Sequence, residues 1–300
     1  MKLGPVLVSL RPEQWTKNLV LLAALAFSKH LFDAGPLLRA LLALALFCGL
    51  SGAVYLLNDV ADRDRDRMHP LKRLRPVASG ALSPRTAVGL AAIIGSACLA
   101  LSFVLGLRFA TCAVVYLALN LLYSFSLKEV VILDVLAISL GFVLRAMAGA
   151  FAIGVDISDW LLVCTILLAL FLTLSKRRHE LTSLEDSAMG HRPTLQEYSP
   201  YLLDQMIAVV TASCLMSYVF YTLSPETRDK FQTDRLAWTI PFVLYGIFRY
   251  LYLVHRKEKG GSPTDMLLTD RPLLIDVFLW ALTVVLIVYT ARGLPVPLGR

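Results

Sequence analysis

Three aspartates and an asparagine in the stretch LLNDVADRDRDRM have the spacing of a metal site. Asn58, Asp62 and Asp66 are four residues apart, so at about 3.6 residues per turn they stack on one helix face, with Asp59 beside them. Carboxylates that converge in this way repel each other unless a cation lies between them. Mg²⁺ suits such hard oxygen ligands, and proteins usually hold it with a few carboxylates plus substrate phosphates. The pattern therefore predicts a magnesium–diphosphate site with these four residues as metal ligands.

Basic residues follow the acids within the same loop. In the stretch HPLKRLRP, Lys72 and Arg75 can bind phosphate oxygens directly, and arginine does so in a forked geometry. Metal-binding acids beside phosphate-binding bases suit a polyphosphorylated substrate. In the helical arrangement Asp64 points away from the other three aspartates. The alternative to a metal site is a solvated loop in which Arg63, Arg65 and Arg67 neutralise the acids.

The segments around this loop have the composition of a membrane protein. Of the 300 residues, 57% are hydrophobic and 17% are charged, whereas a soluble domain averages about 45–50% and about 25%. The segment 37–57 carries one charge, Arg39, and the segment 86–107 carries none. A helix needs about 20 mostly apolar residues to cross the hydrocarbon core. We therefore expect an all-α, polytopic membrane protein.

This length criterion predicts about nine transmembrane helices. We expect them at 18–32, 37–57, 86–107, 109–127, 130–155, 160–175, 201–223, 236–254 and 272–289. Nothing divides the chain into soluble domains, so residues 1–300 are expected to form one helical bundle in the lipid bilayer.

Lysines and arginines indicate the orientation, because loops rich in them stay in the cytoplasm. Nineteen lie in the amino-terminal segment and in the loops on its side of the membrane, against eight on the opposite side. The amino terminus and the loops near 58–85 and 176–200 are therefore expected in the cytoplasm, with these two loops as a cap over the active site.

The five cysteines lie in predicted spans without metal-ligand spacing and are expected to be free packing residues. The net charge of +7 is explained by this topology, and without a basic soluble face we expect no nucleic-acid partner.

Two ionisable residues inside the fifth predicted span form a second group of candidates. Asp134 lies one to two turns into that span, and Arg145 lies about three turns deeper on nearly the same face. A charge at that depth costs at least about 2.5–3.5 kcal/mol unless it faces a polar cavity or a partner. We expect this face to line an aqueous cleft, with a buried ion pair between helices as the alternative. Gly141, Ala148 and Gly149 predict a close approach of neighbouring helices.

Polar residues near the cytoplasmic ends of other spans complete the candidate set. They are Lys17 before the first span, Tyr123, Ser124 and Lys128 before the fifth, and Lys176, Arg177 and Glu180 after the sixth. The cations among them suit phosphate contacts. The alternatives are a helical salt bridge between Lys176 and Glu180 and simple positive-inside anchoring.

These motifs resemble those of a known family. The pattern N-D-x-x-D-x-x-x-D followed by HPLKRLRPVASG is similar to the first signature of the UbiA superfamily of intramembrane prenyltransferases, and RPEQWTKN at 11–18 also fits. A finer resemblance, to the decaprenyl-phosphate phosphoribosyltransferase branch, rests on YSFSLKEVVILD at 123–134, LRAMAGA at 144–150, SKRRHEL at 175–181 and TDRPL at 269–273.

The resemblance implies about nine helices around a central cavity open to the cytoplasm, in a bacterial plasma membrane. It implies Mg²⁺-dependent transfer of a 5-phosphoribosyl group from phosphoribosyl pyrophosphate to a polyprenyl phosphate of decaprenyl type, with release of pyrophosphate. The implied catalytic residues are Asp59, Asp62, Asp66, Lys128 and Asp134. The implied substrate-binding residues are Lys17, Asn58, Lys72, Arg75, Tyr123, Ser124, Arg145, Lys176, Arg177 and Glu180. Whether the chain forms a homo-oligomer is left open by the sequence.

One departure from the family pattern bears on the substrate. Members with aromatic acceptors usually carry a second acidic motif, D-x-x-x-D, after the sixth span. Here that segment opens with three cations and holds Glu180, Glu185 and Asp186 without such a pair. The departure weakens the prediction of a second magnesium ion and favours recognition of an extra phosphate.

Two other functions remain open on the sequence. A prenyl transfer from a prenyl diphosphate to an aromatic or other acceptor would use the same acidic loop. A lipid or solute transporter would place its coupling charges near the bilayer midplane, often in inverted repeats. The acids here lie in a loop and only Arg145 lies deep, which favours an enzyme.

Overall fold

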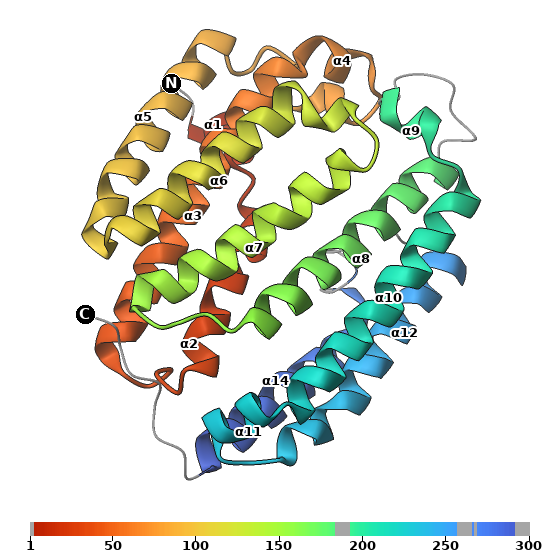
Figure 1. Cartoon of the computed structure of the whole chain (residues 1–300). Helices are drawn as coiled ribbons and strands as arrows, with labels where there is room; N and C mark the ends of the chain where they lie inside the picture. Colours follow the sequence, from red (N-terminus) through yellow and green to blue (C-terminus); the bar gives the residue numbers. More distant parts are fainter. Residues whose placement is uncertain (1–2, 184–192, 257–265, 267–268, 292–300) are drawn as a thin grey trace.

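The chain folds as a bundle of helices in the computed structural model (Figure 1). The structure describes residues 3–183, 193–256, 266 and 269–291, and it contains no strand within these ranges. The predicted all-α class is therefore confirmed.

Eight helical segments in the described part of the chain are long and apolar enough to cross a membrane. They are α3 (Ala34–Ala61), α5 (Pro84–Ser102) with its 3-10 extension η3 (Phe103–Leu105), α6 (Leu107–Phe125), α7 (Leu133–Ile153), α8 (Asp159–Ser183), α10 (Pro200–Leu223), η5 (Arg235–Thr239) with α12 (Ile240–Arg256), and α14 (Arg271–Thr290). The chain is thus a multi-pass membrane protein.

The first predicted span, 18–32, is not one of these helices. Its residues form the second half of the 3-10 helix η1 (Pro12–Leu22), the short helix α2 (Ala23–Phe27) and a turn. The prediction of a continuous α-helix there is wrong, because a hydropathy pattern registers apolar length and not the winding of the backbone.

Shorter elements lie mostly at the ends of the long helices. They are α1 (Leu3–Leu10), α4 (Arg63–Met68), η2 (Lys72–Leu74), η4 (Leu127–Glu129), α9 (Pro193–Glu197) and α11 (Pro225–Phe231). Proline and serine set several boundaries. Ser83, Ser199 and Ser224 each precede a proline and accept a hydrogen bond from a backbone N–H in the first turn of α5, α10 and α11. Such caps satisfy donors that have no partner inside the helix.

The long helices form two groups that meet between α7 and α8 (Figure 1). One buried cluster joins η1, α3, α6 and α7 and contains Leu21, Phe47, Phe109, Tyr116 and Ala148. A second cluster joins α7, α8, α10, α12 and α14. The five cysteines are free, as predicted.

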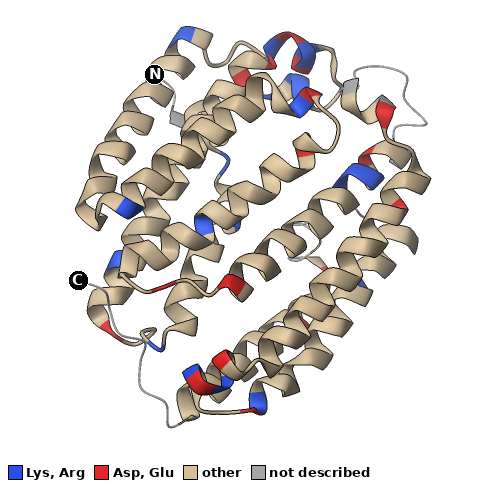
Figure 2. Cartoon of the chain, viewed as in Figure 1, with Lys and Arg blue, Asp and Glu red and all other residues tan. Residues whose placement is uncertain are grey.

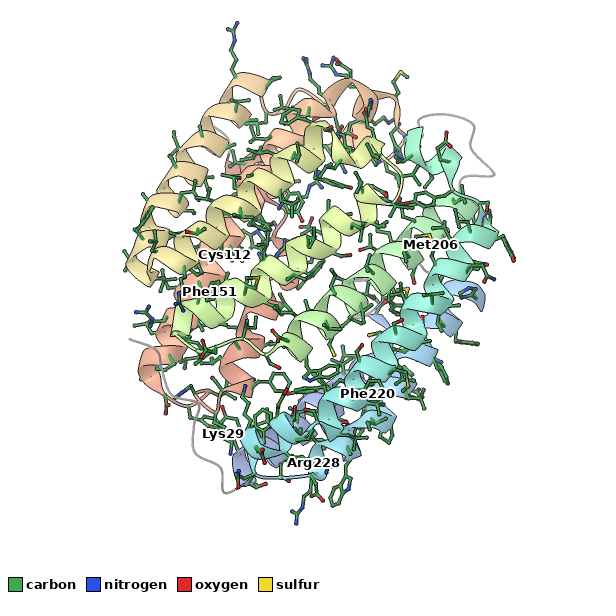
Figure 3. All side chains as sticks on the ribbon, in the orientation of Figure 1. Lys29, Cys112, Phe151, Met206, Phe220 and Arg228 are labelled. Atoms are coloured by element: carbon green, nitrogen blue, oxygen red, sulfur yellow. The ribbon has the colours of Figure 1, made fainter. Side chains whose placement is uncertain are left out.

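Charged residues gather towards the two ends of the bundle, and the helix middles are largely uncharged (Figure 2). The acidic helix α4, the amino-terminal segment and α9 lie at one end, where the two cap loops were predicted. Residues 184–192 of the second cap loop lie outside the described part. Lys29 and Arg228 mark the opposite end (Figure 3).

Phe47 provides a test of the packing in the first helix group. Its side chain is fully buried, and its ring centroid lies 5.7 Å from that of Phe109 and 5.0 Å from that of Tyr116. Phe47→Ala should lower the free energy of unfolding by about 3–5 kcal/mol because it leaves a cavity. The matched control Phe103→Ala, at a 59% exposed position, should change it by about 0.5 kcal/mol or less. Equal losses in denaturant unfolding of the purified protein would contradict this packing.

Candidate active site

The predicted metal ligands lie where α3 ends. α3 stops at Ala61 and the helix resumes as α4 at Arg63, because the backbone torsions of Asp62 (φ −93°, ψ 5°) leave the α-helical range. The prediction that Asn58, Asp62 and Asp66 stack on one continuous helix face is therefore wrong in this detail. The break directs Asp62 and Asp66 to different partners.

Asp59 and Asp66 converge on the same cation. Nη1 of Arg75 lies 2.6 Å from Asp66 Oδ2 and 3.6 Å from Asp59 Oδ1. Arg11, at the turn before η1, makes a second ion pair with Asp59. Both carboxylates are buried, at 1% and 4% exposure, so cations from two other segments compensate charges that water cannot reach. Asp64, with a side chain 91% exposed, faces away as predicted.

Asp62 pairs instead with Lys128, whose Nζ lies 2.7 Å from Asp62 Oδ1. Lys128 belongs to η4, between α6 and α7, and it is buried, which is rare for lysine unless it is paired. The hydroxyl of Thr194 on α9 donates to the Lys128 carbonyl at 3.2 Å. The ion pair therefore joins the acidic segment to the turn that precedes α7.

Asp134 and Arg177 form a separate and more completely buried ion pair. Their side chains are 0% and 3% exposed, and Arg177 Nε lies 2.8 Å from Asp134 Oδ2. The Tyr198 hydroxyl donates to Asp134 at 2.8 Å, and Arg177 also bonds Glu180 at 2.6 Å and Tyr123 at 3.4 Å. Burial, together with the bond to Asp134, raises the pKa of Tyr198 to about 12. Asp134 thus orients Arg177 and Tyr198, and the four predicted residues Asp134, Arg177, Glu180 and Tyr123 lie together in this network.

Arg145 does not line an aqueous cleft, so that prediction is wrong. It is 7% exposed and its three nitrogens bond Asn18 Oδ1 at 2.7 Å, the Gly141 carbonyl at 3.0 Å and the Tyr116 hydroxyl at 2.7 Å. Its guanidinium carbon also lies 4.7 Å and 5.1 Å from the ring centroids of Tyr116 and Phe142. These partners are neutral, so the alternative of a buried ion pair is wrong too.

Lys17 lies on η1 among other cations. It makes no hydrogen bond or ion pair with any residue that the structure describes. Burial, followed by the charges of Lys176, Arg145 and Arg11, lowers the pKa of Lys17 to about 7. An unpaired amine surrounded by positive charge is a favourable position for an anion.

The remaining predicted residues differ in what they contact. Lys176 lies 3.7 Å from Glu180, which is the predicted helical pair. Lys72 is half-buried in η2, three residues before Arg75. Ser124 is buried and donates to the Asn120 carbonyl of its own helix at 2.9 Å, so its hydroxyl is engaged within α6 and not with a ligand.

The acidic residues fit a divalent ion held partly by its substrate. Among the described residues no three carboxylate, histidine or cysteine side chains form a complete metal site. Asp59 and Asp66 nevertheless share one cation position, and Asn58 Oδ1 is buried without a hydrogen-bond partner in the described part. Mg²⁺ commonly takes one or two carboxylates, with waters and phosphates as its other ligands. The fourth predicted ligand, Asp62, is paired with Lys128 in this structure.

Three residues of the site were missed by the sequence reasoning. Arg11 and Asn18 belong to the RPEQWTKN motif, and that motif was the available signal for them. Tyr198 lies in a loop with no motif of its own, and only the fold brings it to Asp134 across 64 residues of sequence. The predicted central cavity and the predicted cap remain predictions.

Comparison with known proteins agrees with this arrangement. Residues 19–282 match the model of the UbiA prenyltransferase family. The chain belongs to this family. Among curated relatives, a decaprenyl-phosphate phosphoribosyltransferase of Corynebacterium glutamicum is 33% identical over 94% of this chain and 86% of its own length. One from Mycolicibacterium smegmatis is 31% identical over 94% and 91%.

A solved structure has the same fold. A UbiA homolog from Archaeoglobus fulgidus, determined with DMAPP and Mg²⁺ bound, superposes with a TM-score of 0.71 at 19% identity, over 95% of this chain and 99% of that one. The family membership and this likeness confirm the predicted superfamily and helical architecture.

The low pKa of Lys17 can be measured by chemical modification. Only the neutral amine reacts with an acylating reagent, so the rate at Lys17 should rise with pH to a midpoint near 7 instead of the usual 10.5. Bound pyrophosphate stabilises the charged amine and should move that midpoint to higher pH. Peptide mass spectrometry of the reacted protein measures the midpoint without pyrophosphate and the midpoint with it. A midpoint near 10.5 without pyrophosphate would contradict the electrostatic environment described here.

Proposed function

We propose that this protein transfers a 5-phosphoribosyl group from phosphoribosyl pyrophosphate to a polyprenyl phosphate of decaprenyl type, in a Mg²⁺-dependent reaction. The observation that carries the proposal is the similarity to decaprenyl-phosphate phosphoribosyltransferases along 94% of the chain. The charges of the site support it. Aspartates of the site pair with cations from four separate segments of the chain, namely Arg11, Arg75, Lys128 and Arg177. Several cations suit a substrate with more than one phosphate group.

Donor binding would exchange the partners of these ion pairs. In the structure, Arg75 and Lys128 compensate Asp66 and Asp62 at 2.6 Å and 2.7 Å. A donor that arrives with Mg²⁺ brings both an anion and a cation. The carboxylates of Asp59, Asp62 and Asp66, with Asn58, would take the metal, and the released cations would take phosphate oxygens. Because each charge keeps a partner, the exchange avoids a buried unpaired charge, which is strongly destabilising.

The chemistry would then need little from protein acids or bases. The bond between the anomeric carbon and the pyrophosphate oxygen breaks, and a bond forms between that carbon and an oxygen of the lipid phosphate. The lipid phosphate is already an anion, so no side chain has to remove a proton from it. When bound, Mg²⁺ supplies positive charge that stabilises the leaving pyrophosphate. The residues of this chain position the two substrates and stabilise the developing charge.

Particular side chains would hold particular parts of the substrates. Arg75 and Lys128 pair with the acids, and Lys17 lies near Arg11, so these three cations are assigned to donor phosphates. Arg177 is held rigidly by Asp134 and is assigned, with Lys176 on the same helix, to the remaining phosphate groups. The polyprenyl tail would lie along the apolar helices, whose middles carry few charges (Figure 2).

We place the protein in the bacterial inner membrane, with the site at the cytoplasmic face. The distribution of lysine and arginine supports this orientation, and the water-soluble donor is available on that side. The loops near 58–85 and 176–200 would cap the site.

A matched pair of aspartate variants tests the metal assignment. Asp66→Asn should lower kcat on the order of 100-fold or more, because it removes a charge that orients the metal and the leaving group. Asp64→Asn lies on the same short helix, but its side chain is 91% exposed, so its kcat should stay within about twofold, as for a surface position. The assay follows labelled phosphoribosyl pyrophosphate into lipid, with Mg²⁺ and a decaprenyl-type phosphate.

Mass spectrometry of the lipid product decides among the functions. A ribose phosphate on the polyprenyl phosphate supports the proposal. A prenyl group found on another acceptor would contradict the proposal and indicate ordinary prenyl transfer. Wild-type activity in Asp66→Asn would overturn the metal assignment.

A further inference from the structure

The amino-terminal helix η1 has an unusual winding. It is a 3-10 helix of 11 residues, whereas runs longer than three or four residues are uncommon. Residues three apart eclipse in such a helix, and burial follows this period. Glu13, Thr16 and Leu19 are exposed, whereas Asn18 and Leu21 are buried. Lys17 is intermediate in burial and lies between the exposed face and the buried face of η1.

Gly149 of α7 holds the inner end of η1 by direct backbone contact. A Cβ atom at Gly149 would lie 2.1 Å from the carbonyl oxygen of Leu21 and 2.8 Å from its carbonyl carbon. No side chain fits at those distances, and the atoms in the way are backbone. The predicted close approach at Gly149 is thereby confirmed, and it fixes where Leu21 lies along α7.

Asn18 fixes the rotation of the same helix. Its Oδ1 accepts the 2.7 Å hydrogen bond from Arg145 Nε, and its Nδ2 donates to Ser51 Oγ at 3.2 Å and to Cys48 Sγ at 3.4 Å. The amide is thus bonded to α3 on one side and to α7 on the other. The structure gives Arg145 no carboxylate partner among the described residues, so its role here is to hold η1 and not to neutralise an acid.

Arg11 fixes the outer end of η1. Its φ of 51° is in the left-handed region that non-glycine residues rarely adopt. Its guanidinium pairs with Asp59 and lies 4.9 Å from the ring centroid of Tyr55. Strained backbone of this kind persists only where the surroundings hold it, and it concentrates at functional sites.

We propose that the 3-10 winding of η1, held by Gly149 and by the bond between Arg145 and Asn18, positions Lys17 for a phosphate group of the substrate. The proposal rests on the proposed function only in taking phosphate as the ligand. An α-helix rises about 0.5 Å less and turns about 20° less per residue than a 3-10 helix. Lys17 is four residues from Leu21, which Gly149 holds in place. If η1 rewound as an α-helix, Lys17 would therefore move about 2 Å towards Leu21 along the helix axis and rotate about 80° around it. Gly149 and Arg145 are positioning residues that act through η1.

The test measures how well inorganic pyrophosphate protects Lys17 from a water-soluble acylating reagent at pH 7.5. In the wild-type protein with Mg²⁺, pyrophosphate should slow the modification of Lys17 at least about tenfold. Gly149→Ala forces η1 away from α7 and should reduce protection to less than about twofold. Gly89→Ala is the matched control, because a Cβ atom there meets nothing within 4 Å, and it should keep wild-type protection.

A second variant covers the case in which Gly149→Ala fails to fold, as judged by size-exclusion chromatography. Asn18→Ala removes the bond to Arg145 without a steric overlap and should lose protection in the same way. Protection retained in both variants, or absent from the wild-type protein, overturns the proposal. Loss of protection in the variants without ribose transfer in the wild type would support the positioning role and contradict the proposed function.

Discussion

Buried carboxylates at the end of α3 require cations within reach, and much of the charged end of the bundle follows from this requirement. Asp59 and Asp66 are almost inaccessible to water, so a buried charge on either needs a cation beside it. Arg75 comes from the loop after α4, Arg11 from the turn before η1. Each ion pair also ties a separate chain segment to α3. The electrostatics of the site therefore help determine the arrangement of the short elements around it.

Balanced charge is compatible with ligand exchange. A site in which acids and bases already neutralise each other can take up a metal and a phosphate together, because each side chain that leaves an ion pair gains an opposite charge from the metal or the phosphate. Lys17 and Arg145 are different. They have no acidic partner among the described residues, and they give the interior around η1 an excess of positive charge that favours an anion.

The sequence predicted the architecture well where apolar length decides it. Eight of the expected spans correspond to long helices, because about 20 apolar residues in a row allow few alternatives in a membrane. That Lys128, Arg177 and the acids belong to one site stays a prediction, because the structure pairs Lys128 with Asp62 and Arg177 with Asp134. The closeness of Gly149 to a neighbour was predicted from its size alone.

The remaining differences depend on tertiary contacts. Arg145 was expected to face water, but Asn18 and Tyr116, 127 and 29 residues away in sequence, supply its acceptors. The winding of η1 depends on the contact with Gly149 on α7, which no local pattern contains. The break at Asp62 gives Asp62 and Asp66 different cations, and it lies in a run of charged residues whose spacing alone favours a continuous helix.

The exchange of ion pairs is the central claim, and a ligand-bound structure tests it most directly. Determination of this protein with Mg²⁺ and a non-reactive analogue of phosphoribosyl pyrophosphate should place the ion between Asp59 and Asp66. Arg75 should then have left Asp66 for a phosphate oxygen. A structure in which Arg75 still bridges the two carboxylates, while the analogue and metal bind elsewhere, would contradict the account.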